Sequence, residues 1–132
     1  YVDLSDAVTA DLQLAKVKNA AGKYIAPTLD AASAALDGAA VESDLTYDPL
    51  NAPGDTAYPI TSPTWIIAYA KQIDAGTADA LKGYLTFVLT DGQGFANSVG
   101  YAKLPQAMID KALAQVDQIS EPSRESVMVL VV

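Results

Sequence analysis

The sequence predicts an α/β fold, with helices packed on a mixed sheet, and three observations support this prediction. Residues 64–69 (TWIIAY) carry no charge, which is typical of a central strand that is covered on both faces. Apolar side chains recur at helical spacing between residues 81 and 89, and again between residues 109 and 119. Hydrophobic residues make up 51% of the 132-residue chain, so its composition and length suit one globular domain with a core.

The N-terminal part of the chain is predicted to hold a short helix and a β-hairpin. Residues 3–13 favour a helix with Asp3 as its N-cap. Residues 14–18 alternate apolar and polar side chains, as a half-buried strand does. Residues 19–22 (NAAG) indicate a turn, so we expect residues 23–25 to form the returning strand.

A second helix is expected to begin after Thr28 and to end near Gly38. Thr28 is a favourable N-cap, and Asp30 places a negative charge in the first turn, where the helix dipole stabilises it. Residues 41–57 are acidic and rich in turn-forming residues. Within them we expect a short strand at residues 45–47, followed by a loop.

Two more helices are expected behind the uncharged strand. Thr77 is the expected N-cap of the first, and Gly83 within this helix indicates close packing against a neighbour. A short helical turn is expected at residues 95–99. Pro105 suits the first position of the last helix, where its missing N–H has no intrahelical partner to lose.

The C-terminal residues 126–132 (SVMVLVV) are apolar and favour a β-strand. They are too few to span a bilayer, which takes about 20 residues in a helix. Two interpretations stay open for them: an edge strand of the sheet, or the start of a longer segment.

Charge and composition exclude several classes of function. The net charge of −8 disfavours binding to nucleic acids or anionic membranes. The chain contains neither Cys nor His, so we expect no enzyme activity, no cofactor and no metal site. Asp44, Asp48 and Asp55 lack the spacing of a calcium-binding EF-hand loop, and a solvated acidic loop is the preferred interpretation.

Four short segments carry a family resemblance. They are residues 22–29 (GKYIAPTL), 58–60 (YPI), 90–93 (TDGQ) and 100–105 (GYAKLP). In this order and at this spacing they resemble the C-terminal part of the phosphate-binding proteins that supply ABC phosphate importers. The resemblance extends over nearly all of residues 1–120.

This resemblance implies part of a type 2 periplasmic-binding-protein fold, in which two α/β lobes enclose the ligand. Residues 1–57 would then end the second lobe, residues 58–120 would supply the returning strand and closing helices of the first lobe, and residues 121–132 would form an apolar tail. The implied ligand is inorganic phosphate or a similar oxyanion, the implied partner is an ABC permease, and the implied location is the cell surface or periplasm.

In the family that the chain resembles, the loops that hold the anion lie upstream of the segment matching Tyr1. We therefore expect the chain to be a C-terminal fragment whose ligand-binding residues belong to an upstream segment, carried by its own precursor or by a companion chain. The only arginine, Arg124, follows the last core helix.

A hinge is predicted at Tyr58, Pro59, Ile60 and Thr61, where the resemblance places the crossing between lobes. Proline fixes one backbone torsion while its neighbours absorb a rotation of the lobes. Simple packing is the alternative for this segment. The alternative function for the whole chain is a surface structural or adhesion module that keeps the fold without binding phosphate.

Overall fold

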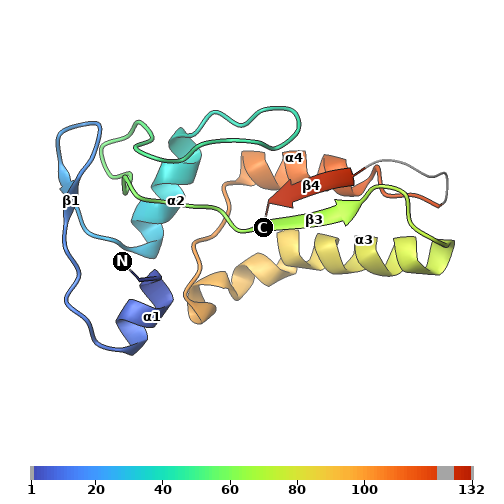
Figure 1. Cartoon of the computed structure of the whole chain (residues 1–132), viewed down its shortest axis with the longest axis horizontal. Coiled ribbons are helices and arrows are strands. Elements are labelled where there is room, and N and C mark those ends of the chain that lie inside the picture. Colours follow the sequence, from blue (N-terminus) through green and yellow to red (C-terminus); the bar gives the residue numbers. More distant parts are fainter. Residues whose placement is uncertain (1, 122–126, 132) are drawn as a thin grey trace.

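The computed structural model describes residues 2–121 and 127–131 (Figure 1). Its helices are α1 (Leu4–Thr9), α2 (Leu29–Gly38), α3 (Ala75–Leu89) and α4 (Gln106–Val116). Its strands are β1 (Val17–Lys18), β2 (Tyr24–Ile25), β3 (Trp65–Tyr69) and β4 (Val127–Val131). Two short 3-10 helices, η1 (Asp91–Gly94) and η2 (Ala96–Val99), connect α3 to the segment before α4.

The strands pair in two small antiparallel sheets. Strands β1 and β2 form the predicted hairpin, with Val17 opposite Ile25. Strand β3 pairs with β4 over five residues, from Trp65 opposite Val131 to Tyr69 opposite Val127. Residues 127–131 of the apolar tail therefore form an edge strand, which is one of the two interpretations given above.

Helices and strands do pack together as the α/β prediction requires, but the prediction of a strand covered on both faces is wrong. Ile67 and Tyr69 of β3 are 69% and 67% exposed. The physical reason is that, within the described residues, β3 has β4 as its one strand neighbour, and only Trp65, Ile66 and Ala70 of this segment pack against the core.

The main core lies between α3, α4 and β3 (Figure 1). Its fully buried members come from both helices and from the turn after α4: Leu85, Leu89, Ala112, Val116 and Ile119. Leu36 of α2 and Leu45 of the following loop complete it from the N-terminal half of the chain. Apolar burial at about 25 cal/mol per Å² makes this cluster the principal source of stability.

A second, smaller cluster packs α2 against the loop before β3. It consists of Ala35, Ala52 and Ala57, and these small side chains allow a close approach. At Gly38 the approach is closer still, because an added Cβ would lie 2.3 Å from the carbonyl oxygen of Pro53. Consecutive residues of α2, Ala35 and Leu36, thus belong to two different clusters.

The helix caps are partly those that the sequence predicts. Asp3 accepts a hydrogen bond from the Ser5 N–H, and Thr28 accepts one from the Ala31 N–H. The prediction for α3 is wrong, because its N-cap is Asp74. The Asp74 carboxylate accepts from both the backbone N–H and the hydroxyl of Thr77, which makes Thr77 a donor inside the first turn.

The predicted strand at residues 45–47 is also wrong. Leu45 has a φ of 67°, which breaks any extended run. The Asp44 carboxylate accepts hydrogen bonds from the backbone N–H and the hydroxyl of Thr46, which hold the pKa of Asp44 below its usual value. This turn, rather than a strand, directs Leu45 and Tyr47 toward the core.

The Tyr47 ring packs against Trp65 at the edge of the core, with ring centroids 5.4 Å apart and planes inclined by 47°. Among the described residues its buried hydroxyl has no hydrogen-bond partner. Burial raises the pKa of Tyr47 to about 12.

The two glycines in helices α2 and α3 predict opposite responses to alanine. Gly38→Ala forces the helix away from the Pro53 carbonyl and should destabilise the chain by about 1–3 kcal/mol. Gly83 has open space around it, which removes close packing as its explanation, so Gly83→Ala should stabilise the chain by about 0.5–1 kcal/mol. Urea unfolding of both variants tests this pair of predictions. If the two changes in unfolding free energy had the same sign, this account of α2 would be contradicted.

The isolated Tyr47 hydroxyl predicts a pH dependence. Its folded pKa lies above the unfolded value of 10.0, so its contribution to stability is complete below pH 10 and is lost as the pH rises toward 12. The stability of Tyr47→Phe should therefore fall less steeply than that of the wild type as the pH rises above 10. At pH 7 the variant should lose no stability. Thermal unfolding followed from pH 7 to 11.5 measures this, and an unchanged pH profile would refute it.

Candidate functional site

Three of the four motif segments meet at helix α2. Segment 22–29 leads directly into this helix. The Tyr58 N–H donates to the carbonyl of Ala31 at 3.0 Å, which attaches the segment at residues 58–60. From the other side, the Ser33 hydroxyl donates to the carbonyl of Lys103 at 3.0 Å. Segments that are distant in sequence are thus joined through one helix, by the backbone carbonyl of Ala31 and the side chain of Ser33.

Gln93 joins the fourth motif, TDGQ, to the GYAKLP segment. Its side-chain amide donates to the carbonyl of Val88 at 2.9 Å, at the end of α3. Its side-chain oxygen accepts from the Leu104 N–H, also at 2.9 Å. The TDGQ and GYAKLP segments are therefore held by one side chain, a role that the sequence analysis missed although the motif contains the residue.

Asn19 fastens the hairpin turn to the loop before Tyr58. It is 5% exposed, its side-chain oxygen accepts from the Lys23 N–H at 3.0 Å, and its amide donates to three carbonyls. These carbonyls belong to Gly54 at 3.0 Å, Asp55 at 3.3 Å and Ala57 at 3.2 Å. Lys23 also forms an exposed ion pair with Asp55. An asparagine at the start of a tight turn was the available sequence signal.

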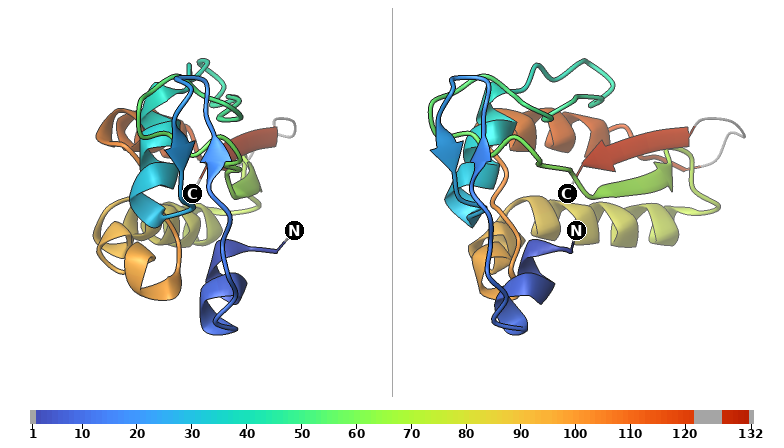
Figure 2. Two further views of the ribbon diagram at one scale, coloured as in Figure 1. Left: turned by 90° about the vertical axis from the view of Figure 1, so that its left-hand side faces the viewer. Right: turned by 60° about the vertical axis from the view of Figure 1, so that its left-hand side comes forward.

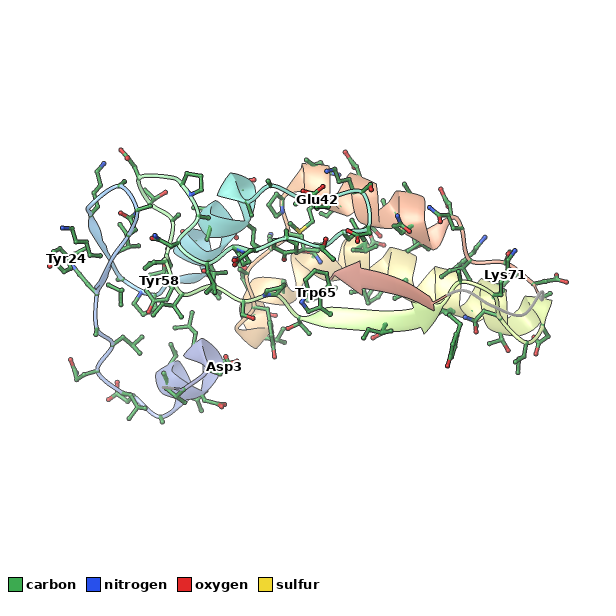
Figure 3. All side chains as sticks on the ribbon, turned by 45° about the horizontal axis from the view of Figure 1, so that its top comes forward. Asp3, Tyr24, Glu42, Tyr58, Trp65 and Lys71 are labelled. Atoms are coloured by element: carbon green, nitrogen blue, oxygen red, sulfur yellow. The ribbon has the colours of Figure 1, made fainter. Side chains whose placement is uncertain are left out.

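The predicted hinge residues lie between α2 and β3, and Figure 3 labels Tyr58 and Trp65 at the two ends of this stretch. Pro59 is buried and its carbonyl accepts from the Asn51 N–H at 2.8 Å. Thr61 is 7% exposed and its hydroxyl donates to the Tyr58 carbonyl at 3.0 Å, whereas Ile60 is 63% exposed. The geometry fixes both ends of the segment, and its action as a hinge stays a prediction.

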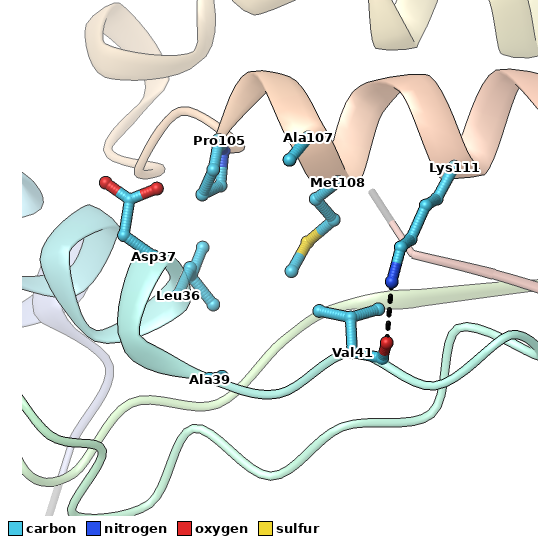
Figure 4. A pocket seen from close by; sticks show the side chains of 8 residues that line it. All are labelled: Leu36, Asp37, Ala39, Val41, Pro105, Ala107, Met108 and Lys111. Carbon is cyan, nitrogen blue, oxygen red and sulfur yellow. Dashed lines mark hydrogen bonds between the residues drawn. The ribbon is translucent and has the colours of Figure 1, made fainter.

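A cavity of about 150 Å³ opens between α2 and α4 (Figure 4). Its lining is mainly apolar, with one carboxylate and one ammonium: Leu36, Asp37, Ala39, Val41, Pro105, Ala107, Met108 and Lys111. The Lys111 ammonium already donates to the Val41 carbonyl at 2.6 Å. No ring of convergent donors faces this cavity, so it lacks the chemistry to hold a dehydrated anion.

A wider depression of about 420 Å³ lies between the hairpin and the start of α2. Its lining residues are Lys16, Tyr24, Ile25, Ala26, Thr28, Asp30, Ala31 and Thr56. The Asp30 carboxylate in the first turn of α2 opposes an anion at this helix N-terminus, and the Thr28 oxygen already accepts from Ala31. Neither cavity therefore supplies a phosphate site from the described residues alone.

Within residues 2–121 and 127–131, no three acidic side chains gather closely enough to hold a metal ion. No helix in this part of the chain has the length and apolar composition needed to cross a membrane.

Comparison with known proteins supports the motif resemblance. No protein-family model matches the chain. The phosphate-binding protein PstS of Methanocaldococcus jannaschii is 33% identical over 92% of the chain, and that of Xylella fastidiosa strain 9a5c is 28% identical over 83%. PstS of Pasteurella multocida is 26% identical over 87% of the chain. The chain is a relative of part of the PstS phosphate-binding proteins.

The chain spans about a third of the length of these PstS relatives, 34%, 30% and 34% respectively. The motifs that revealed the relationship are the segments that the hydrogen bonds of Ser33, Tyr58 and Gln93 join together. In this chain, these residues position elements relative to one another.

Gln93 supports a direct test of this role. Gln93→Ala removes the acceptor of the partly buried Leu104 N–H and the donor to Val88, and should destabilise the chain by about 1–3 kcal/mol. Gln118→Ala is the matched control, because this exposed side chain lies just after α4 and donates a long, local hydrogen bond to the Ala114 carbonyl at 3.5 Å. Denaturant unfolding compares the two variants. Equal losses of unfolding free energy would show that the hydrogen bonds of Gln93 do not stabilise the fold.

Proposed function

We propose that this chain is the C-terminal portion of a solute-binding protein for inorganic phosphate, which delivers phosphate to an ABC importer. The supporting observation is its 33% identity to the Methanocaldococcus jannaschii phosphate-binding protein over 92% of the chain. We place it at the cell surface or in the periplasm, where such a protein meets its solute.

The proposed location of the anion-binding groups, outside this chain, follows from the chemistry of the described residues. A dehydrated phosphate is held by backbone N–H groups at helix N-termini, by hydroxyls and by an arginine, while an aspartate accepts its remaining proton. Neither of the two cavities described above, which the described residues line, offers such a set. The anion-binding loops therefore belong to the part of the relatives that this chain does not span, on its precursor or on a companion chain.

The contribution of this chain is then mechanical. The junction around α2 fixes the hairpin, the loop before Tyr58 and the segment before α4 to one helix. Residues 58–61 leave this junction and lead to β3 in the main core. Closure around phosphate would rotate one region against the other through these few residues, with Pro59 held and Ile60 free to turn.

A second candidate function is a surface structural or adhesion module with the same fold. Two observations favour it: the cavities lack anion-binding groups, and the apolar β4 covers one edge of β3. Phosphate binding by the assembled protein distinguishes the two candidates.

Calorimetric titration with phosphate, and with sulfate as the control anion, tests the proposed function. The 132-residue chain alone should give no binding heat, because its cavities lack the required donors. The chain joined to its upstream segment, or mixed with the unmatched two-thirds of the Methanocaldococcus jannaschii protein, should bind phosphate and reject sulfate. Phosphate binding by the chain alone would contradict its assignment as a partial site. Absence of binding heat from the assembled protein would favour the structural module.

A further inference from the structure

Asn19 is a buried polar side chain that makes more hydrogen bonds than its own turn needs. The backbone already closes this turn, because the Asn19 N–H donates to the Lys23 carbonyl and the Gly22 N–H donates to the Asn19 carbonyl, both at 2.9 Å. The side-chain oxygen adds a bond from the Lys23 N–H. The side-chain nitrogen instead donates to carbonyls that lie 35 to 38 residues later in the chain.

The loop that leads to the predicted hinge, residues 51–59, is called the hinge loop below. Its ends are joined, because the Asn51 N–H donates to the Pro59 carbonyl at 2.8 Å. It contains no helix or strand, and both views of Figure 2 show the tip of the β1–β2 hairpin beside it. A closed loop without regular structure depends on donors from elsewhere to satisfy its carbonyls and fix its path.

The Asn19 side chain supplies those donors. An amide nitrogen carries two protons, and here it serves three acceptors, the carbonyls of Gly54, Asp55 and Ala57. Within the described residues, these three carbonyls accept from no other group. Because Asn19 is 5% exposed, the loss of these bonds costs more than the loss of bonds at the surface.

The last of these carbonyls directly precedes the predicted hinge. Tyr58 follows Ala57, and its N–H donates to the Ala31 carbonyl of α2 at 3.0 Å. Ala57 itself is fully buried. Asn19 and α2 therefore hold the chain from two sides at the point where the hinge begins, whereas Ile60 beyond this point is exposed.

We propose that Asn19 is a positioning residue for phosphate capture, because its amide fixes the hinge loop and thereby the point about which the two regions rotate. This inference rests on the proposed function, since it takes closure around phosphate as the motion that the hinge serves. A hinge loop that is fixed in advance loses little conformational entropy on closure. A released loop would make the closed form less favourable and let phosphate leave faster.

Asn19→Asp separates the contact with the hinge loop from the turn. The new carboxylate has nearly the same shape and can still accept from the Lys23 N–H, so the turn is retained. It has no proton to donate to the three carbonyls and repels them. Protonation restores one donor, so a lower pH should partly reverse the effect. The charged side chains of the hairpin tip and the hinge loop are Lys18, Lys23 and Asp55, and the last two pair with each other.

Amide hydrogen exchange in the 132-residue chain, followed by NMR, tests whether Asn19 fixes the hinge loop. In Asn19→Asp at pH 7, the N–H groups of Asn51 and Tyr58 should exchange about tenfold faster than in the wild type. The N–H of Leu85 in the main core should be accelerated less, because the hinge loop opens without unfolding the core. Equal acceleration of all three groups, or none, would overturn the proposal.

Asn97→Asp is the matched control for this substitution. It makes the same change of charge on an exposed side chain of η2, which forms no hydrogen bond with the described residues. Its exchange rates should stay within about twofold of the wild type. Equal effects of Asn97→Asp and Asn19→Asp would assign the acceleration to charge alone and contradict the role of the amide.

Phosphate kinetics of the chain joined to its upstream segment test the role in capture. Asn19→Asp at pH 7 should release phosphate about tenfold faster than the wild type, with association unchanged within about twofold. The ratio of the two release rates should fall toward one at about pH 5, whereas Asn19→Ala should show no such recovery.

The remaining outcomes separate this inference from the proposed function. Release by Asn19→Asp at the wild-type rate would overturn the inference and leave the proposed function standing. Absence of phosphate binding by the assembled wild type would contradict the proposed function, and with it the role in capture. Faster exchange in the hinge loop of Asn19→Asp would in that case still uphold the contact of Asn19 with the loop.

Discussion

Helix α2 has to pack against two surfaces at once, and the arrangement of the other elements depends on this constraint. Ala35 contacts the small cluster that includes Ala52 and Ala57, while Leu36 enters the main core with α3 and α4. Gly38 permits the final approach to the Pro53 carbonyl. In the same helix, the Ala31 carbonyl accepts a hydrogen bond from the Tyr58 N–H, and the Ser33 hydroxyl donates one to the Lys103 carbonyl. A shift of α2 would therefore disturb the hairpin loop, the predicted hinge and the start of α4 together.

Local features of this fold could be predicted from the sequence, because they depend on neighbouring residues. The caps at Asp3 and Thr28 and the turn that ends at Gly22 depend on groups within a few positions. The strand expected at residues 45–47 fails for an equally local reason, since Asp44 and Thr46 favour a turn over pairing. The surroundings of β3 could not be predicted. An uncharged strand composition predicts burial on both faces, but it does not identify the elements that would bury them, and Ile67 and Tyr69 are exposed.

The family relationship was predicted from the motifs, but the contacts between the motifs were not. Resemblance in four short segments indicated the relationship that the PstS comparisons support. The hydrogen bonds that join those segments link residues far apart in the sequence, such as Ser33 with Lys103 and Asn19 with Ala57. Periodicity and capping rules cannot pair such distant positions. The hinge assigned to residues 58–61 is still a hypothesis, although both of its neighbouring regions are now defined.

The contact between Tyr47 and Trp65 has a practical consequence. Trp65 is the only tryptophan in the chain, and it opens β3 four positions after Thr61. Its partner Tyr47 belongs to the loop that follows α2, and the two rings lie 5.4 Å apart between centroids. Indole fluorescence is sensitive to nearby rings and to solvent, so any rotation that separates the α2 junction from β3 changes the emission of a single, native fluorophore. Tryptophan emission would therefore report, without an added label, whether residues 58–61 act as the predicted hinge.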